Sequence, residues 1–158
     1  MNDTLANFER IARLAGDISS PPDEVTEPSA HPFDERNIHV DIAKVSRKLF
    51  DDGHFSQATF EAFKFLDNRV KKLSKVKDSG YKLMMAAFAE ASPKIKLTAL
   101  STASEVDEQM GYKFIFAGAM SAIRNPRGHE NLVDPIDLCL DHLSFASVLL
   151  RRLEKTVP

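Results

Sequence analysis

Arg124, Asn125 and His129 stand within six residues of one another, and together they carry the groups that act on a phosphodiester. An imidazole with a pKa of about 6.5 takes or gives a proton at neutral pH. A guanidinium stays charged and binds phosphate oxygens with paired hydrogen bonds. Beside a ribose, His129 would remove the 2′-hydroxyl proton while Arg124 stabilises charge building on the phosphate. Such a reaction needs RNA and no metal ion, and Asn125 would hold the phosphate or orient Arg124.

The segment before this motif, Phe114 to Ile123, carries no charge. We expect it to form a helix that is buried on nearly all sides. It is too short to span a membrane, which takes about 20 apolar residues. Pro126 disfavours helical ψ in the residue before it, so the helix is expected to stop near Arg124. Gly128 would then let the chain reverse, which would place Arg124 and His129 across one turn.

Composition limits the classes of protein that the chain can belong to. Its 158 residues suffice for one well-packed domain. The 21 basic and 23 acidic residues give a net charge of −2, which argues against wrapping by DNA through bulk electrostatics. The single cysteine, Cys139, excludes an intrachain disulfide and a cysteine-rich zinc site. No histidines pair at ligand spacing, so we expect no metal and no cofactor. The N-terminus lacks a secretory signal pattern, which predicts a cytoplasmic protein.

Hydrophobic periodicity predicts an all-α fold with a helix and a Pro-rich arm before it. Residues 1–36 hold a helix that begins at Asn2 or Asp3 and a linker from Ser19 to Pro32, and residues 37–157 form the domain. The expected N-caps are Asp34 or Asn37, then Ser56 with a Phe55–Phe60 staple, then Ser104 and Asp134. A stripe of Phe63, Leu66, Val70 and Leu73 should face the core. Gly53 should end the preceding helix in a left-handed conformation.

Four phrases of the sequence resemble a known family. They are K-V-S-R-K-L-F-D-D-G-H at residues 44–54, E-A-F-K-F-L at 61–66, F-A-G-A-M at 116–120, and R-N-P-R-G-H-E at 124–130. The wording is similar to the uncharacterised Ymh-type family from about residue 37 to residue 155. The Arg–polar–His spacing also resembles the HEPN superfamily of helical bundles. Gly128 departs from the pattern, since Ala is common at that position.

The HEPN resemblance implies a bundle of about four main helices plus short ones, and a metal-independent endoribonuclease. Many members act as toxins of toxin–antitoxin systems or in phage (antiviral) defence. They commonly form homodimers whose two motifs face one cleft, and an antitoxin or defence-system protein can be a partner. The resemblance assigns phosphate binding to Arg124, positioning to Asn125 and general acid/base work to His129. Arg127 would add a phosphate contact, and Glu130 would orient an imidazole or neutralise Arg127.

Two other functions fit the same residues. One is a non-catalytic module that binds RNA or a nucleotide. The other is a helical protein-interaction domain in which Arg124 and Arg127 cap helix carbonyls and pair with Glu130 or Asp134. Other residues also have two interpretations. The basic run from Arg69 to Lys77 is either a path for RNA or a solvated helix end.

Overall fold

The computed structural model describes residues 7–11 and 30–156. The chain divides into two units, residues 1–30 and residues 31–158. In the first unit, residues 7–11 form a short, exposed helical segment. This segment falls inside the helix predicted from Asn2 or Asp3, whose caps lie outside the described residues, as does nearly all of the predicted linker.

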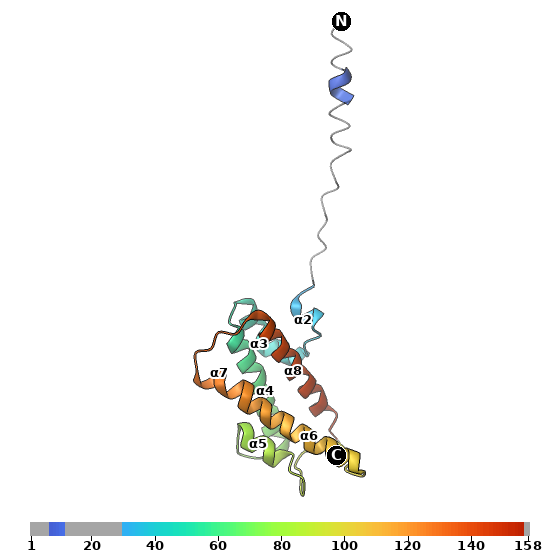
Figure 1. Cartoon of the computed structure of the whole chain (residues 1–158), viewed down its shortest axis with the longest axis vertical. Coiled ribbons are helices and arrows are strands. Elements are labelled where there is room, and N and C mark those ends of the chain that lie inside the picture. The colour runs from blue at the N-terminus through green and yellow to red at the C-terminus, as the bar shows by residue number, and fades with distance from the viewer. Residues whose placement is uncertain (1–6, 12–29, 157–158) are drawn as a thin grey trace. The chain divides into compact units, whose positions relative to one another are not determined.

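The second unit consists of helices, and its described residues contain no β-strand, so the predicted all-α class is confirmed (Figure 1). It has seven α-helices and one π-helical turn: α2 (Pro32–Glu35), α3 (Val40–Asp51), α4 (Phe55–Ser74), α5 (Gly80–Ala87), α6 (Ala103–Ala119), η1 (Met120–Arg124), α7 (Asn125–His129) and α8 (Ile136–Glu154). The short α2 precedes residue 37, where the sequence predicts the start of the domain. Its Phe33 is only 2% exposed and belongs to the core.

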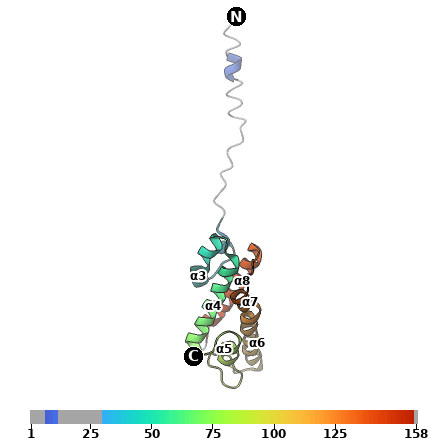
Figure 2. The same ribbon diagram turned by 90° about the vertical axis from the view of Figure 1, so that its left-hand side faces the viewer.

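Helix α4 is the element around which the others pack. Helices α3, α5, α7 and α8 and the turn η1 all contact it, and Figures 1 and 2 show it running through the middle of the unit. Phe63, Leu66 and Val70 are fully buried, as their helical spacing predicts, whereas Leu73 is 42% exposed. The core continues between α5 and α6, where Phe88 and Phe116 stack with ring centroids 4.9 Å apart.

The sequence predicted one of the helix ends near α3 and α4 correctly and two of the N-caps wrongly. Gly53 has φ +79° just after α3, so its predicted left-handed role is confirmed. The predicted N-caps of α3 and α4 are wrong. His39, not Asp34 or Asn37, caps α3 by accepting a hydrogen bond from the Asp41 N–H. Helix α4 begins after His54, so Ser56 lies inside it.

The predicted stop near Arg124 is also wrong. Helices α6 and α7 are joined through η1 into one continuous rod, which Figure 1 shows. The N–H of Asn125 donates to the carbonyl of Met120 five residues earlier, and this is the wider π spacing. Pro126 therefore falls in the first turn of a new α-helical segment, where a missing N–H costs little. The chain leaves the helix only at Glu130, which is extended.

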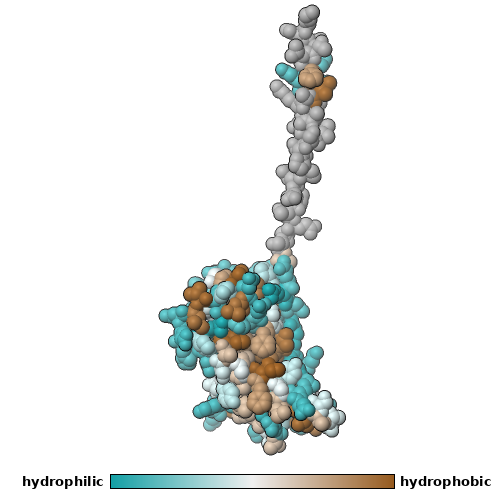
Figure 3. All heavy atoms as spheres, in the orientation of Figure 1, coloured by the Kyte–Doolittle hydropathy of each residue, from teal (hydrophilic) through white to brown (hydrophobic). Residues whose placement is uncertain are grey.

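Helix α6 is not buried on nearly all sides, in contrast to the prediction. Phe114 and Ile115 are 52% and 43% exposed, and Gly111 and Gly118 face open space. Hydrophobic side chains gather over the middle of α6 in Figure 3. Its buried side packs through Phe116 instead. Within the described residues, no helix combines the length and the apolar character that crossing a membrane requires.

Candidate functional site

Arg124 ends the π-helical turn, and its half-buried guanidinium has no carboxylate partner among residues 30–156. Its Nη1 donates to Asn125 Oδ1 at 3.2 Å, and its Cζ lies 5.4 Å from the centroid of the Phe60 ring. The Nε of Arg124 is buried and has no hydrogen-bond partner. Buried donors without a partner in the protein are uncommon in folded chains. The carboxylate of Glu61 pairs with Lys64 at 3.0 Å.

Asn125 lies where three elements meet. A Cβ built on Gly80, the first residue of α5, would lie 3.8 Å from Asn125 Oδ1. The N–H of Gly80 donates to the buried Asp67 carboxylate of α4 at 2.6 Å. The N-terminus of α5 is thus fixed to α4 directly beside the Arg124–Asn125 pair. Asp67 and Gly80 were not predicted as site residues, because nothing in their spacing connects them with residue 125.

His129 is exposed in the last turn of α7. Asn125 precedes it by four residues, so these two side chains share one face of the helix. Arg124 precedes His129 by five residues, so on a regular helix the side chains of these two residues point about 140° apart around the axis. The expected arrangement of Arg124 and His129 across one turn is therefore wrong, because the helix does not stop between them. On a regular helix, the two side chains of one chain therefore leave the backbone in different directions.

Arg127 forms an ion pair with Asp134, which is one of the pairings expected for a protein-interaction domain. Its Nε and Nη2 donate to the two Asp134 oxygens at 2.6 and 2.8 Å, and its Nη1 donates to the Ile123 carbonyl at 2.8 Å. The backbone N–H of Asp134 donates in turn to Ser56 Oγ at 2.9 Å. These contacts fix the connection between α7 and α8 to the start of α4. Glu130 is exposed at the beginning of that connection.

Gly128 allows α7 to pack closely on α4. A Cβ at this position would lie 2.9 Å from Cε2 of the Phe60 ring, closer than side chains normally approach. The ring of Phe60 therefore lies beneath both Gly128 and Arg124. Its sequence position suggested only a hydrophobic staple, so its contact with the Arg124 guanidinium was not foreseen. The predicted chain reversal at Gly128 is wrong, since the residue is helical.

A hollow of about 330 Å³ lies beside the motif and not at it. Its walls come from the α3–α4 turn and from the connection before α8. Arg127 and Glu130 line it together with His54, and Arg124, Asn125 and His129 do not. Two of the five predicted site residues therefore face this hollow, while the other three lie outside it.

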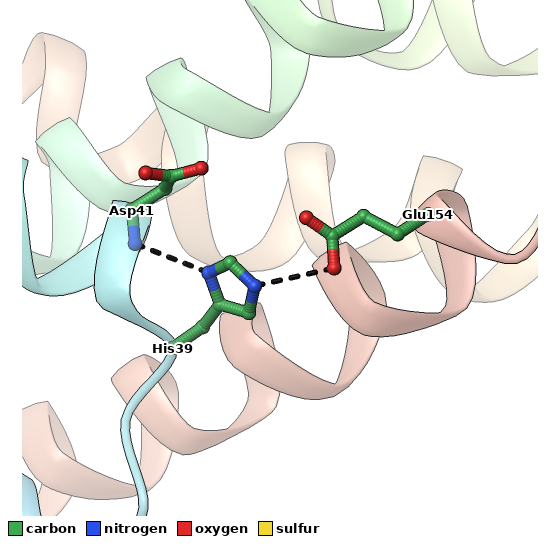
Figure 4. Close-up of side chains that lie close together, drawn as sticks. All are labelled: His39, Asp41 and Glu154. Carbon is green, nitrogen blue, oxygen red and sulfur yellow. Dashed lines mark hydrogen bonds and ion pairs between the residues drawn. The ribbon is translucent and has the colours of Figure 1, made fainter.

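His39, Asp41 and Glu154 place three possible ligand atoms within 4.8 Å of one another (Figure 4). Nδ1 of His39 accepts the Asp41 N–H at 3.1 Å, and Nε2 lies 3.2 Å from Glu154 Oε2. Since Nδ1 accepts, the ring proton sits on Nε2 and is donated to Glu154. A metal at Nε2 would force the neutral ring to abandon the helix cap. The trio thus joins α3 to α8.

Two reactive side chains of α8 are shielded from solvent, Cys139 completely and His142 in part. Cys139 is fully buried, and its Sγ donates to the Phe55 carbonyl at 3.3 Å. Burial raises the pKa of this thiol. His142 stands edge-on to Phe63, with a buried Nδ1 that has no partner. Burial, and then the nearby Arg127 charge, lower the pKa of His142.

Comparison with known proteins adds a family. Residues 36–153 match the family described as "Protein of unknown function (Hypoth_ymh)". The chain belongs to the Hypoth_ymh family. The match covers every helix of the second unit from α3 to α7 and nearly all of α8. No curated protein and no solved structure matches the chain. Membership in the Hypoth_ymh family therefore confirms the Ymh-type resemblance and assigns no chemistry.

Proposed function

We propose that this member of the Hypoth_ymh family is a metal-independent endoribonuclease of the HEPN type. The observation that carries the proposal is the state of Arg124. Its guanidinium lies over the Phe60 ring, its Nε is buried without a partner, and Arg127 has taken the carboxylate of Asp134. A cation held in place without an anion is a binding site for a phosphate oxygen.

The reaction follows from the three motif residues. His129 takes the proton of a ribose 2′-hydroxyl, and the 2′-oxygen attacks the adjacent phosphorus. Arg124 donates to the phosphoryl oxygens as their charge increases, while Asn125 keeps Nη1 of Arg124 in place. The bond to the 5′-oxygen breaks, and that oxygen takes up a proton from the protonated His129, which returns to its neutral form. The products are a 2′,3′-cyclic phosphate end and a 5′-hydroxyl end.

Two copies of the chain would complete the site, because Arg124 and His129 diverge within one copy. The exposed face of α6 supports a homodimer. It presents Phe114 and Ile115 between Gly111 and Gly118, whose open positions permit close approach of another backbone. A parallel pair of α6 helices, with the two-fold axis along them, would bring the two η1–α7 segments near each other, since they continue the same rods. Each site would then use Arg124 of one copy and His129 of the other.

Cleavage of RNA in the presence of EDTA tests the proposal. Cyclic phosphate ends should form with the wild-type chain and disappear with His129→Ala and with Arg124→Ala. Mixing these two inactive variants tests the shared site, because a mixed dimer would retain one site with both residues intact. Random pairing should restore about a quarter of the wild-type sites. Full activity of His129→Ala would refute the assigned base, and no recovery on mixing would refute the shared site.

Phe114→Glu provides an independent test of the dimer. A buried charge at the α6 face should give a monomer in sedimentation experiments and remove cleavage, while the fold persists because Phe114 is exposed within one copy. Lys94→Glu is a matched control, since that side chain is also exposed. A dimer that survives Phe114→Glu would place the interface elsewhere.

The toxin or phage-defence role, and an antitoxin or defence-system partner, belong to the same proposal. They follow from the HEPN resemblance and not from the geometry. Induced expression in a bacterial host tests the toxin role. Growth should stop with the wild-type chain and continue with His129→Ala at equal protein levels. Equal toxicity of both chains would separate any toxic effect from RNA cleavage.

A second candidate is an RNA- or nucleotide-binding module without turnover. The divergence of Arg124 and His129 within one chain favours it. Salt-sensitive RNA binding that Arg124→Ala weakens, with no cyclic phosphate products, would establish this function. A third, a helical protein-interaction domain, is favoured by the apolar α6 face. In that case Arg124→Ala would leave RNA binding unchanged.

A further inference from the structure

Positive charge is concentrated on one segment of the chain. Residues 63–82 contain seven of the 21 basic residues and only two acidic ones, and the rest of the chain has fourteen basic and 21 acidic residues. The seven are Lys64, Arg69, Lys71, Lys72, Lys75, Lys77 and Lys82. A nearly neutral protein therefore carries a strongly basic region at α4 and just beyond it.

Two of these lysines lie along one face of α4, and a third ends the helix. Lys64 and Lys71 are seven residues apart, or two helical turns. Lys75 is the exposed, left-handed C-cap, whose N–H donates to the Lys71 carbonyl. The exposed Asn68 occupies the same face between Lys64 and Lys71. These four residues, which we call the α4 stripe, extend over about 16 Å of helix axis.

The α4 stripe is poorly neutralised. Lys64 pairs with Glu61 of its own helix at 3.0 Å, whereas Lys71 and Lys75 have no ion pair among residues 30–156. Cations near a helix C-terminus interact favourably with the macrodipole, and that effect is confined to about the last turn. It accounts for Lys71 and Lys75 and not for Lys64, which lies in the middle of α4.

The stripe leads to Arg124 through Phe60. The Nζ of Lys64 lies 5.6 Å from the centroid of the Phe60 ring, and the Cζ of Arg124 lies 5.4 Å from the same centroid. Asp67 on α4 also holds Gly80 beside Asn125. One helix thus positions the motif and carries Lys64 and Lys71.

We propose that the α4 stripe binds the phosphate backbone of single-stranded RNA and leads the strand to Arg124. This inference rests on the proposed function, which makes RNA the substrate. Ammonium groups bind phosphates as point charges without reading bases, so the stripe would add affinity without sequence preference. A narrow line of cations that ends at the Arg124 guanidinium fits a polyanionic strand better than it fits a broad anionic membrane surface.

The test uses the full chain and a labelled short RNA with 2′-O-methyl groups, which cannot be cleaved. Binding is followed by fluorescence anisotropy between about 50 and 200 mM salt. Lys71→Gln/Lys75→Gln should weaken binding roughly tenfold at low salt and reduce the slope of log K against log salt by about 1.4. Lys94→Gln/Lys96→Gln removes the same charge from two exposed lysines beyond α5 and should match the wild-type chain.

Equal binding by the two double variants would overturn the inference, and so would a stripe-dependent preference for phosphatidylserine vesicles over RNA. Cleavage of unmodified RNA separates this inference from the proposed function. Stripe-dependent binding with no cleavage would leave the stripe established and remove the nuclease. Cleavage whose KM does not change in Lys71→Gln/Lys75→Gln would leave the nuclease and remove the stripe.

Discussion

The Asp134 carboxylate binds the Arg127 guanidinium at two points, with oxygen–nitrogen distances of 2.6 and 2.8 Å, and both side chains are only 6% exposed. This pair closes the connection between α7 and α8. Two arginines three residues apart therefore have different tasks. Arg127 maintains the fold, and Arg124 remains available to an anion.

Asp134→Ala should lower the free energy of unfolding by about 3–5 kcal/mol, because it leaves a buried guanidinium without its partner. Urea denaturation measures this loss. Arg127→Met/Asp134→Leu should recover most of the stability, since it removes both charges together. Asp52→Ala, which breaks the exposed pair with Lys48, should have a much smaller effect. Equal losses from the buried and the exposed pair would contradict the structural role.

Gly128→Ala should be stabilising only after Phe60 is made smaller. Alanine is better than glycine in a helix by about 0.8–1.0 kcal/mol, but its Cβ would meet the Phe60 ring at 2.9 Å. In a Phe60→Leu background the substitution should raise the free energy of unfolding by about 0.5–1 kcal/mol. In the wild-type background the gain should be lost or reversed. A double-mutant cycle measures the coupling, and strict additivity would show that the two residues do not interact.

Stability should decrease as the pH falls below about 6.5, in part because of His142. The pKa of this side chain is lowered from its ordinary value of 6.5, first by burial and then by Arg127. Between the lowered and the ordinary pKa the unfolded chain binds a proton that the folded chain does not, so unfolding becomes more favourable as pH falls. His142→Gln should reduce this slope in urea denaturation series. Parallel pH profiles for the two chains would rule out His142 as the cause.

Cys139 should resist thiol reagents at neutral pH. Its side chain is fully buried, and burial raises the pKa of the thiol. Only the thiolate attacks such reagents, so reaction should require opening of α8. The rate with an aromatic disulfide should rise sharply in urea, near the unfolding midpoint. Rapid stoichiometric reaction of the native chain would show that the packing between Cys139 and Phe55 opens locally.

Apolar spacing predicted the fold well where burial alone decides structure. Phe63, Leu66 and Val70 are buried as expected, and Gly53 ends α3 in a left-handed conformation. The helix starts were harder to predict, because an N-cap depends on which acceptor reaches an N–H in three dimensions. His39 supplies such an acceptor through Nδ1, and histidine is not a residue that usually signals a cap.

The site was predictable in its residues and not in its geometry. The Arg–Asn–His spacing identified the motif, but the proline rule placed a helix end before Pro126 that the π turn makes unnecessary. The division of work between Arg124 and Arg127 depends on Asp134, seven residues beyond Arg127. Phe60 lies far from both arginines in sequence, and only packing brings its ring beneath Arg124.

The π-helical turn Met120–Arg124 determines the direction in which the side chains after it point around the helix axis. Such a turn is equivalent to one residue inserted into a regular helix, and each residue of a regular helix advances the direction by about 100°. Shortening this turn by one residue would restore regular α-helical spacing and keep every motif side chain. The Arg124 guanidinium would nevertheless turn away from the Phe60 ring. The rotation of the motif residues about the helix axis, and not their identity alone, therefore determines whether Arg124 can take its place over Phe60.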